Sequence, residues 1–288
     1  MDDESASWDW QCVRYEVFPG VAELGVHLMV GAKRCKDADT AVRISKRLSE
    51  LGLCSRREGD RYIAQGFVTV DGVVIKELGT KGGRPQTVQL NRQGKKQQDT
   101  RITAILNKPI GFISHADDGH FYQTATSLIT PCNFFPSASS MPIPFKNGGK
   151  DMDVHGLAPA GRLDIESSGL LVLTQDGRIA KQLIGNNNQI EKEYLVRVKG
   201  SLSDSGLDAL RNGSLQLDGH RLKPAKVYLQ NKHQLRFVLR EGKKRQLRRM
   251  CEMVGLGVTG LKRVRVGRVL LGNLPMGKWR CLRPGETF

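Results

Sequence analysis

The first well-patterned stretch of the chain changes its hydrophobic period from helical to alternating. In "RISKRLSELGL", Ile44, Leu48 and Leu51 recur at helical spacing, and a glycine follows as a stop signal. "SRREGDRYIAQG" opens with Ser55 and Glu58 in the capping-box arrangement, which predicts a second helix. "FVTVDGVVIKE" then places Asp-Gly between two β-branched runs, the pattern of a hairpin. The sequence therefore predicts helix, helix and hairpin in one small unit.

Strands dominate the rest of the chain. "RITAILNKPIGFIS" begins with Ile102, Ala104 and Leu106 in alternation, as on a half-buried strand that a Lys-Pro step ends. Later strand-like segments are interrupted by helices at irregular intervals, and "KKRQLRRMCEMVGL" reads as an arginine-rich helix. This order favours an α+β fold with a largely antiparallel sheet rather than repeated βαβ units.

These changes of pattern divide the chain. We expect an acidic N-terminal extension of unassigned role over residues 1–42 and a small helical domain over 43–90. A polar, aperiodic linker is expected over 91–100, and a larger domain over 101–288. Within the larger domain, residues 131–156 are rich in Pro, Ser and Gly and predict a long insert, either functional or disordered.

The charge balance indicates an anionic partner. The 288 residues carry a formal net charge of +16, although the first forty residues are acidic on balance. Nucleic acid is the favoured partner and an anionic membrane the second choice, because no basic amphipathic helix with a broad apolar face is evident. A basic protein without a polyanionic partner remains the alternative.

The cysteines indicate a reducing compartment, and the apolar runs indicate no membrane helix. The six cysteines form no C-x-x-C pair, so neither a zinc site nor a disulfide framework is suggested. No run approaches the roughly 18 apolar residues of a membrane helix, and no secretory or usual organellar signal is visible. We expect a cytoplasmic protein, or an organellar or nuclear one if the source is eukaryotic, with no membrane partner.

The stretch "AGRLDIESSGLLVLTQDGR" presents a candidate catalytic carboxylate, Asp164. A lone carboxylate repels phosphate, and a two-metal nuclease needs several convergent carboxylates where only Glu166 and Asp176 are near. An ionised Asp164 can instead act as a nucleophile at carbon, or as a base, on a flipped-out nucleotide. It then needs a cationic partner, and the "RQLRR" helix is the obvious supplier.

The small helical unit resembles a known RNA-binding domain. "RISKRLSELGLCSRREGDRYIAQGFVTVDGVVI" is similar to the S4 (αL) domain, whose two helices present a basic face to structured RNA. A helical pair with a solvated charged face is the alternative. The resemblance implies RNA contacts from Arg43, Lys46, Arg47, Arg56, Arg57 and Arg61.

The larger domain resembles the RNA pseudouridine synthases. "LNKPIGFIS", "GRLDIESSGLLVLTQDG", "EKEYLVRV", "EGKKRQLRRMCE" and "LPMGKWRCL" occur in the order of the RsuA class, which includes the RluB, RluE and RluF branches acting on ribosomal RNA. "GNNNQIEKEYLVRV" and "RQLRRMCE" lean towards the RluF branch. The resemblance covers roughly Arg43 to Arg283, apart from the linker and the insert.

What the resemblance implies is an enzyme. It implies an S4 domain followed by a catalytic domain with a mainly antiparallel mixed β-sheet and flanking helices. The activity is isomerisation of a uridine to pseudouridine in structured RNA, with large-subunit ribosomal RNA first and transfer RNA as a further possibility. No metal and no organic cofactor are expected, and we expect a monomer. A non-catalytic S4-domain protein of ribosome assembly is the alternative.

The resemblance also assigns roles to individual residues. Asp164 is the catalytic aspartate, which attacks the anomeric carbon or assists elimination. Arg162 enters the gap left by the flipped nucleotide, and Tyr194 stacks on uracil and helps remove its carbon-five proton. Arg248 pairs with the aspartate, and Leu247 packs on the base. The other basic residues of that helix are assigned to phosphate: Lys243, Lys244, Arg245 and Arg249.

Each of these residues also has an ordinary structural interpretation. Asp164 could cap a turn, and Arg162 could be its surface ion-pair partner. Tyr194 could be core on a strand, and Arg248 could contact phosphate alone.

Overall fold

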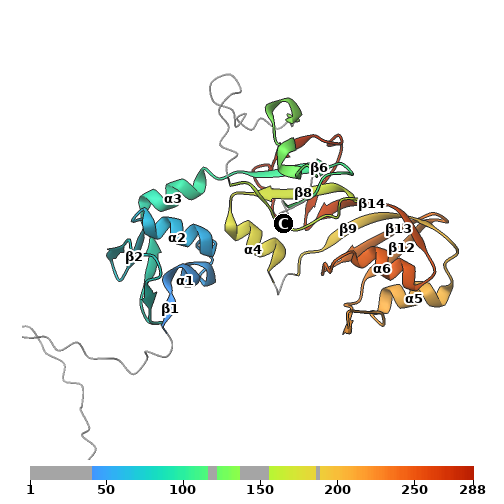
Figure 1. Cartoon of the computed structure of the whole chain (residues 1–288), viewed down its shortest axis with the longest axis horizontal. Coiled ribbons are helices and arrows are strands. Elements are labelled where there is room, and N and C mark those ends of the chain that lie inside the picture. Colours follow the sequence, from blue (N-terminus) through green and yellow to red (C-terminus); the bar gives the residue numbers. More distant parts are fainter. Residues whose placement is uncertain (1–40, 116–121, 137–155, 186–188) are drawn as a thin grey trace, which may run out of the picture. The chain divides into compact units, whose positions relative to one another are not determined.

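The computed structural model describes residues 41–115, 122–136, 156–185 and 189–288 (Figure 1). The acidic extension therefore lies almost wholly outside the described residues, and so does most of the insert expected over 131–156.

The small domain has the helix, helix and hairpin order that the sequence predicts. Two helices pack against each other, and one short sheet has the order β3-β2-β5 while a second pairs β1 with β4. Its elements are β1 (Val42–Arg43), α1 (Ile44–Glu50), α2 (Arg56–Ala64), β2 (Val68–Val70), β3 (Val73–Ile75), β4 (Lys81–Gly82) and β5 (Val88–Leu90).

Local sequence signals determine the ends of these elements. Ser55 accepts a hydrogen bond from the Glu58 N–H at 3.3 Å, and the Glu58 carboxylate accepts one from the Ser55 N–H at 2.6 Å, so the expected capping box is confirmed. Asp71 and Gly72 have φ of 50° and 83°, the left-handed pair that a tight hairpin needs. The domain core consists of Ile44, Leu48, Cys54, Tyr62, Ile63, Val68, Val88 and Leu90.

The stretch expected to be a linker contains a helix, α3 (Arg92–Asp99). Its N-cap Asn91 accepts a hydrogen bond from the Gly94 N–H at 2.9 Å, and buried Gln98 donates to the Leu53 carbonyl. Capping and polar tertiary contacts stabilise this helix, which explains why the sequence shows no apolar periodicity that would predict it.

The larger domain is built around one large mixed sheet. Its order is β12-β13-β9-β14-β8-β6-β16, with β15 on β14 and β7 on β8. The strands are β6 (Thr103–Lys108), β7 (Ala158–Pro159), β8 (Ser168–Thr174), β9 (Lys192–Lys199), β12 (Lys226–Asn231), β13 (Gln234–Leu239), β14 (Gly257–Val266), β15 (Val269–Leu270) and β16 (Trp279–Cys281). Among the described strands of this sheet only β14 and β8 pair in parallel, so the expected mainly antiparallel α+β fold is confirmed.

Helices cover the sheet on both faces. Buried residues of α5 (Asp204–Asn212) and α6 (Gln246–Met253) join the core on one face, and α4 (Gly177–Ile184) joins the core on the other. The remaining elements are the 3-10 turns η2 (Ala125–Leu128) and η3 (Pro131–Asn133) and a small hairpin of β10 (Gln216–Leu217) and β11 (His220–Arg221). Each helix in the described ranges is too short or too polar to span a membrane.

The expectation of a half-buried first strand is wrong. Every residue of β6 is buried, because the strand lies between β8 and β16 inside the sheet and both faces are covered. Ala104 and Leu106 belong to the core cluster on one face, and Ile105 belongs to the cluster on the other.

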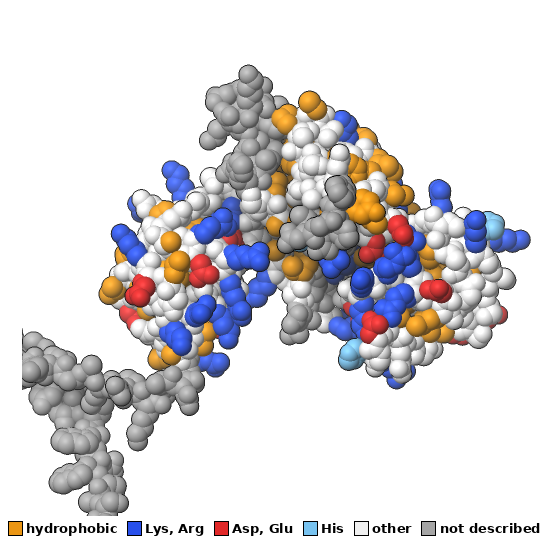
Figure 2. Space-filling model, in the orientation of Figure 1, with side chains coloured by type: hydrophobic (Ala, Val, Ile, Leu, Met, Phe, Trp, Pro, Cys, Tyr) orange, Lys and Arg blue, Asp and Glu red, His pale blue; other side chains and the backbone are white. Residues whose placement is uncertain are grey.

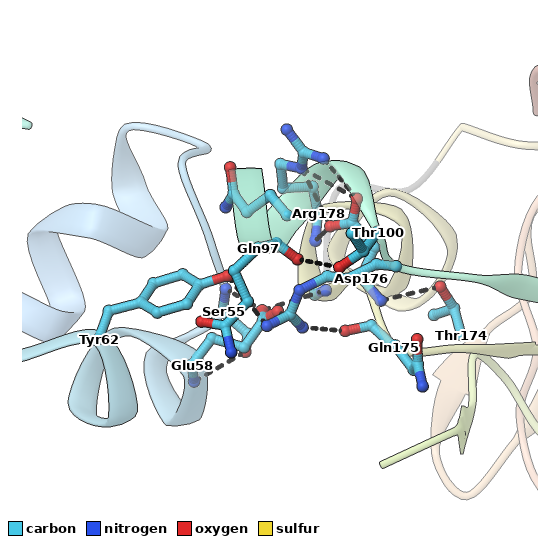
Figure 3. A network of polar contacts seen from close by, with 12 residues as sticks. Ser55, Glu58, Tyr62, Gln97, Thr100, Thr174, Gln175, Asp176 and Arg178 are labelled. Atoms are coloured by element: carbon cyan, nitrogen blue, oxygen red, sulfur yellow. Dashed lines mark hydrogen bonds and ion pairs between the residues drawn. The ribbon is translucent and has the colours of Figure 1, made fainter. Parts of the chain in front are cut away.

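A polar network lies at the start of the larger domain (Figure 3). Arg101 donates to the Glu58 carboxylate, to the Gln175 carbonyl and, at 2.9 Å, to the Tyr62 hydroxyl. The Glu58 carboxylate also accepts a hydrogen bond at 3.1 Å from the N–H of Gly177, the first residue of α4. Glu58 is buried, so these partners provide the compensation that a buried charge requires.

Candidate active site

Asp164 lies in the loop that joins β7 to β8. The loop closes as a turn, because the Ser167 N–H donates to the Asp164 carbonyl at 2.9 Å. The Asp164 side chain is half-buried, and its carboxylate makes no hydrogen bond or ion pair to any residue that the structure describes. Asp164 therefore does not serve as the turn-capping residue of this loop, and its carboxylate is available to a substrate.

The segment after β6 holds the backbone on both sides of Asp164. The Ser114 hydroxyl accepts from the Leu163 N–H at 2.9 Å and donates to the Leu163 carbonyl at 2.6 Å. On the other side, the Gly111 N–H donates to the Ile165 carbonyl at 2.9 Å. Both residues next to Asp164 are thus tied to one short segment.

Two arginines anchor the next residues outward. Arg263 donates from Nη1 to the Arg162 carbonyl at 3.3 Å, and Arg248 donates from Nη2 to the Glu166 carbonyl at 3.1 Å. Every residue from Arg162 to Glu166 except Asp164 is therefore held at its main chain by a distant element.

Arg263 connects this loop to the strand that carries Tyr194. It lies on β14, opposite Gly169 of β8 and opposite Tyr194 of β9. Directly opposed residues of an antiparallel pair point to the same face, so Arg263 and Tyr194 share one face of the sheet. The buried guanidinium also donates to the Leu170 carbonyl at 2.7 Å. The loop and Tyr194 are thereby brought to one site.

Lys108 is a further member of the site that the sequence did not single out. It is fully buried at the end of β6, and its ammonium donates to the Pro109 and Phe112 carbonyls at 2.8 Å each. Burial lowers its pKa to about 8; the Asp164 carboxylate acts to raise that pKa and Arg263 acts to lower it. The sequence signal that could have identified it is a lysine at the end of an apolar strand, directly before a proline.

Lys192 adds a second lysine of the same kind. It lies two residues before Tyr194 on β9, so the two side chains lie on the same face of that strand. Burial, and to a lesser degree Arg263, lowers the pKa of Lys192 to about 8. We call Lys108, Lys192 and Arg263 the basic cluster, since Arg263 acts on the pKa of both lysines.

The expected pairing of Arg248 with Asp164 is absent from the structure. The Arg248 Nε lies 3.4 Å from the carboxylate of Glu166, which also pairs with Arg245 at 3.2 Å. Arg249 pairs with Asp218 through two hydrogen bonds of 2.8 and 2.9 Å. The arginines of α6 are therefore matched by carboxylates, a pairing that residue spacing alone does not reveal.

Most of the other expected site residues lie where a substrate contact is possible. The Arg162 side chain is exposed, and so are Lys244 and Arg245, whereas Lys243 is half-buried. Tyr194 and Leu247 are 8% and 5% exposed and belong to the same core cluster as Leu163. Tyr194 and Leu247 thus have the packing of core residues, with only a small part of each side chain open.

The six basic residues of the small domain that are expected to contact RNA differ in their surroundings. Four are exposed arginines whose side chains make no ion pair or hydrogen bond within the described ranges, namely Arg43, Arg56, Arg57 and Arg61. Figure 2 shows Lys and Arg side chains gathered over this domain. Lys46 makes a loose pair with Glu50 at 3.6 Å.

Arg47 differs from the expectation for this domain. It is buried, and its guanidinium donates to the carbonyls of Gly83, Arg84 and Gln86. Its side chain holds the loop between β4 and β5, so it is not available on the exposed basic surface.

Comparisons with known proteins agree with this architecture. Residues 42–81 match the S4 domain model, and residues 102–253 match the model of the RNA pseudouridylate synthases. A "Dual-specificity RNA pseudouridine synthase RluF" from Salmonella typhi is 33% identical over 87% of this chain and 78% of that protein. A "Ribosomal large subunit pseudouridine synthase B" from Bacillus subtilis (strain 168) is 33% identical over 85% of this chain and 93% of its own length.

A solved structure shows the same fold. A crystal structure described as pseudouridylate synthase aligns with a TM-score of 0.56 over 85% of this chain and 97% of its own, at 24% identity. An S4 domain followed by a synthase domain, with Asp164 presented in an anchored loop, defines an RNA-modifying enzyme. The chain belongs to the RNA pseudouridine synthase family, and its activity is the isomerisation of uridine to pseudouridine in RNA.

Proposed function

We propose that this synthase isomerises a uridine of large-subunit ribosomal RNA and that Asp164 is its catalytic carboxylate. The observation that carries the proposal is the anchoring of the Asp164 loop. The main chain is held at Leu163, Ile165 and Glu166, while the carboxylate itself has no partner among the described residues. A group fixed in position and left unpaired is arranged to act on a substrate.

The chemistry needs one bond to break and another to form. The bond between N1 of uracil and C1′ of ribose breaks, uracil rotates, and C5 forms the new bond to C1′. The proton on C5 is lost and N1 gains one, so the reaction is a redox-neutral isomerisation without a co-reactant. Asp164 either forms a transient bond to C1′ or assists elimination from the ribose, and both paths fit an ionised carboxylate.

The surrounding residues take supporting roles in this proposal. Lys108 of the basic cluster interacts electrostatically with the Asp164 carboxylate and so supplies positive charge near it. Tyr194 contacts the uracil through its open edge, and Leu247 packs beside it. Exposed Arg162 fills the place that the flipped nucleotide leaves in the RNA.

Further basic residues contact the RNA backbone. The exposed arginines of the S4 domain bind phosphate, and so do the basic residues around the start of α6. We propose a monomer that acts in the cytoplasm without metal or cofactor. The four described cysteines are free, as in a reducing compartment, and the relatives named above are bacterial.

The names of relatives guide the choice of RNA. The relative from Bacillus subtilis is named for the ribosomal large subunit, which supports large-subunit RNA as substrate. The relative from Salmonella typhi is named as a dual-specificity enzyme, so transfer RNA is the second RNA to test.

The test uses RNA transcripts that carry tritium at carbon five of uracil. Formation of the new carbon–carbon bond expels this tritium into water, so release measures the reaction directly. Wild-type protein in the presence of chelator should release tritium from large-subunit RNA. Asp164→Asn should reduce the rate by at least about 10³-fold, as loss of a nucleophile does elsewhere, while RNA affinity is retained.

Asp208→Asn is the matched control, because Asp208 is an exposed carboxylate on α5. It should release tritium at the wild-type rate. Release from transfer RNA alone would contradict the proposed substrate, and full activity of Asp164→Asn would contradict the proposed catalytic residue.

A further inference from the structure

The hydroxyl of Ser114 forms an unusual pair of hydrogen bonds. It accepts from the Leu163 N–H at 2.9 Å and donates to the Leu163 carbonyl at 2.6 Å, so one side chain satisfies both backbone groups of a single residue. Ser114 and Leu163 are 5% and 6% exposed, so water cannot readily replace these bonds. Buried backbone groups that lose their partner are costly, and this pair is therefore held firmly.

The two bonds fix the direction in which Asp164 leaves the chain. The Leu163 N–H belongs to the peptide plane before that residue, and the carbonyl belongs to the plane that leads into Asp164. Holding both planes sets φ and ψ of Leu163, which in turn directs the Cα–Cβ bond of Asp164. The Ile165 carbonyl is held by Gly111 from the same segment, so the two restraints bracket the aspartate.

The segment that contains Gly111 and Ser114 is itself held by Lys108, a member of the basic cluster. Lys108 donates to the carbonyls of Pro109 and Phe112, which shapes the turn that leads to Ser114. The buried lysine therefore acts on the turn, and the turn acts on the loop through Ser114 and Gly111. This chain of contacts ends at the residue before Asp164 and the residue after it.

We propose that Ser114 is a positioning residue for Asp164 and that its hydroxyl sets the rate of the chemical step without contributing to RNA affinity. The inference rests on the proposed role of Asp164. Ser114 acts only through the backbone of Leu163 and touches neither the reacting atoms nor the RNA.

The test compares Ser114→Ala with Thr103→Val under single-turnover conditions. Thr103 makes a buried hydroxyl bond of 2.7 Å to Thr174, at the end of β6 remote from Lys108, so its loss weakens the same sheet away from the site. Saturating enzyme in excess over tritiated RNA gives a rate constant that reports only folded, RNA-bound molecules. RNA affinity is measured separately with Asp164→Asn as background.

Ser114→Ala should slow the single-turnover rate by about 10- to 100-fold, because a displacement of about 1 Å at a reacting group has effects of that size. Its RNA affinity should match that of wild type, and Thr103→Val should keep the wild-type rate. Ser114→Thr keeps the hydroxyl and should recover most of the rate.

Three results would overturn the inference. A Ser114→Ala rate equal to that of Thr103→Val would show that the hydroxyl is structural only. A slower reaction explained fully by weaker RNA binding would place the effect in recognition. If wild type releases no tritium from any RNA, the proposed function fails and the inference fails with it, an outcome distinct from the other two.

Discussion

Helices α2 and α6 are both rich in arginine, but their arginines have different surroundings. On α2, Arg56, Arg57 and Arg61 are exposed, and no acidic partner lies within ion-pair distance among the described residues. On α6, Arg248 pairs with Glu166 and Arg249 pairs with Asp218. The first helix offers free charge to any polyanion, whereas the second uses charge to fix geometry. We therefore expect the α2 arginines to bind RNA and Arg248 to shape the catalytic site.

Among the changes that test this contrast, Arg248→Met should have the largest effect. The change removes the hydrogen bond to the Glu166 carbonyl and so loosens one side of the Asp164 loop. The single-turnover rate should fall by about 10²-fold, with RNA affinity changed little. Arg249→Met is the control on the same helix, since Arg249 pairs only with Asp218 at the surface. An equal loss of rate in both variants would show that Arg248 has no special role in fixing the Asp164 loop.

The comparison between exposed and buried basic residues also applies to the stability of the protein, for which Lys108 is the test. Its pKa is about 8 in the folded protein against an ordinary value of 10.5, so between these values the unfolded chain binds more protons. The free energy of unfolding should therefore rise with pH from 8 to 10.5, by at most about 3 kcal/mol from this residue.

Denaturant titrations of wild type and Lys108→Met across that pH range measure this contribution. The variant should lose part of the rise, while Lys46→Met, which removes a lysine of α1 whose side chain is 44% exposed, should retain all of it. A flat profile for wild type would show that Lys108 keeps an ordinary affinity for its proton.

The free arginines of α2 should control affinity and its salt dependence. Replacing Arg56, Arg57 and Arg61 together by Gln should weaken RNA binding by about 10-fold at low salt and reduce the slope of log affinity against log salt by about 2. The single-turnover rate at saturation should stay at the wild-type value. Lys232→Gln, at the exposed turn between β12 and β13, is the control. A slower chemical step in the triple variant would contradict the division of roles.

The smallest effect is expected when an α6 arginine is freed from its carboxylate partner, so that it is unpaired like the arginines of α2. Asp218→Asn removes the carboxylate that holds Arg249 through two hydrogen bonds. The freed guanidinium should tighten RNA binding at low salt by about threefold at most, since exposed ion pairs are weak. The gain should disappear at high salt. Asp208→Asn should leave RNA affinity unchanged. An identical gain in affinity for Asp208→Asn would show that the effect of Asp218→Asn comes from the change in net charge and not from the release of Arg249.

The sequence predicted those features that depend on neighbouring residues. The capping box at Ser55 and Glu58 and the left-handed pair at Asp71 and Gly72 are local arrangements, so the amino acids themselves specify them. The helix, helix and hairpin order of the small domain, the mainly antiparallel sheet of the larger domain and the family also followed from the sequence. The ordered motifs singled out Asp164 as the candidate catalytic residue.

Features that depend on distant residues could not be predicted in this way. Nothing near Arg248 in the sequence reveals that Glu166 is its partner, because loop and helix meet only in the folded sheet. Full burial of β6 depends on β16, which closes the edge of the sheet beside it. The α3 helix depends on the contact of Gln98 with Leu53. The positioning role proposed for Ser114 depends on its hydrogen bonds to Leu163, which the sequence does not reveal.

The pairing of Leu106 with Trp279 has a consequence for the order of events during synthesis. The S4 domain is built from contacts close in the chain, and such contacts form early. The catalytic sheet pairs its first strand with its last, so it closes only after the C-terminal strand has left the ribosome. We therefore expect a growing chain to complete its S4 domain before its catalytic sheet, and so to bind RNA before it can modify it.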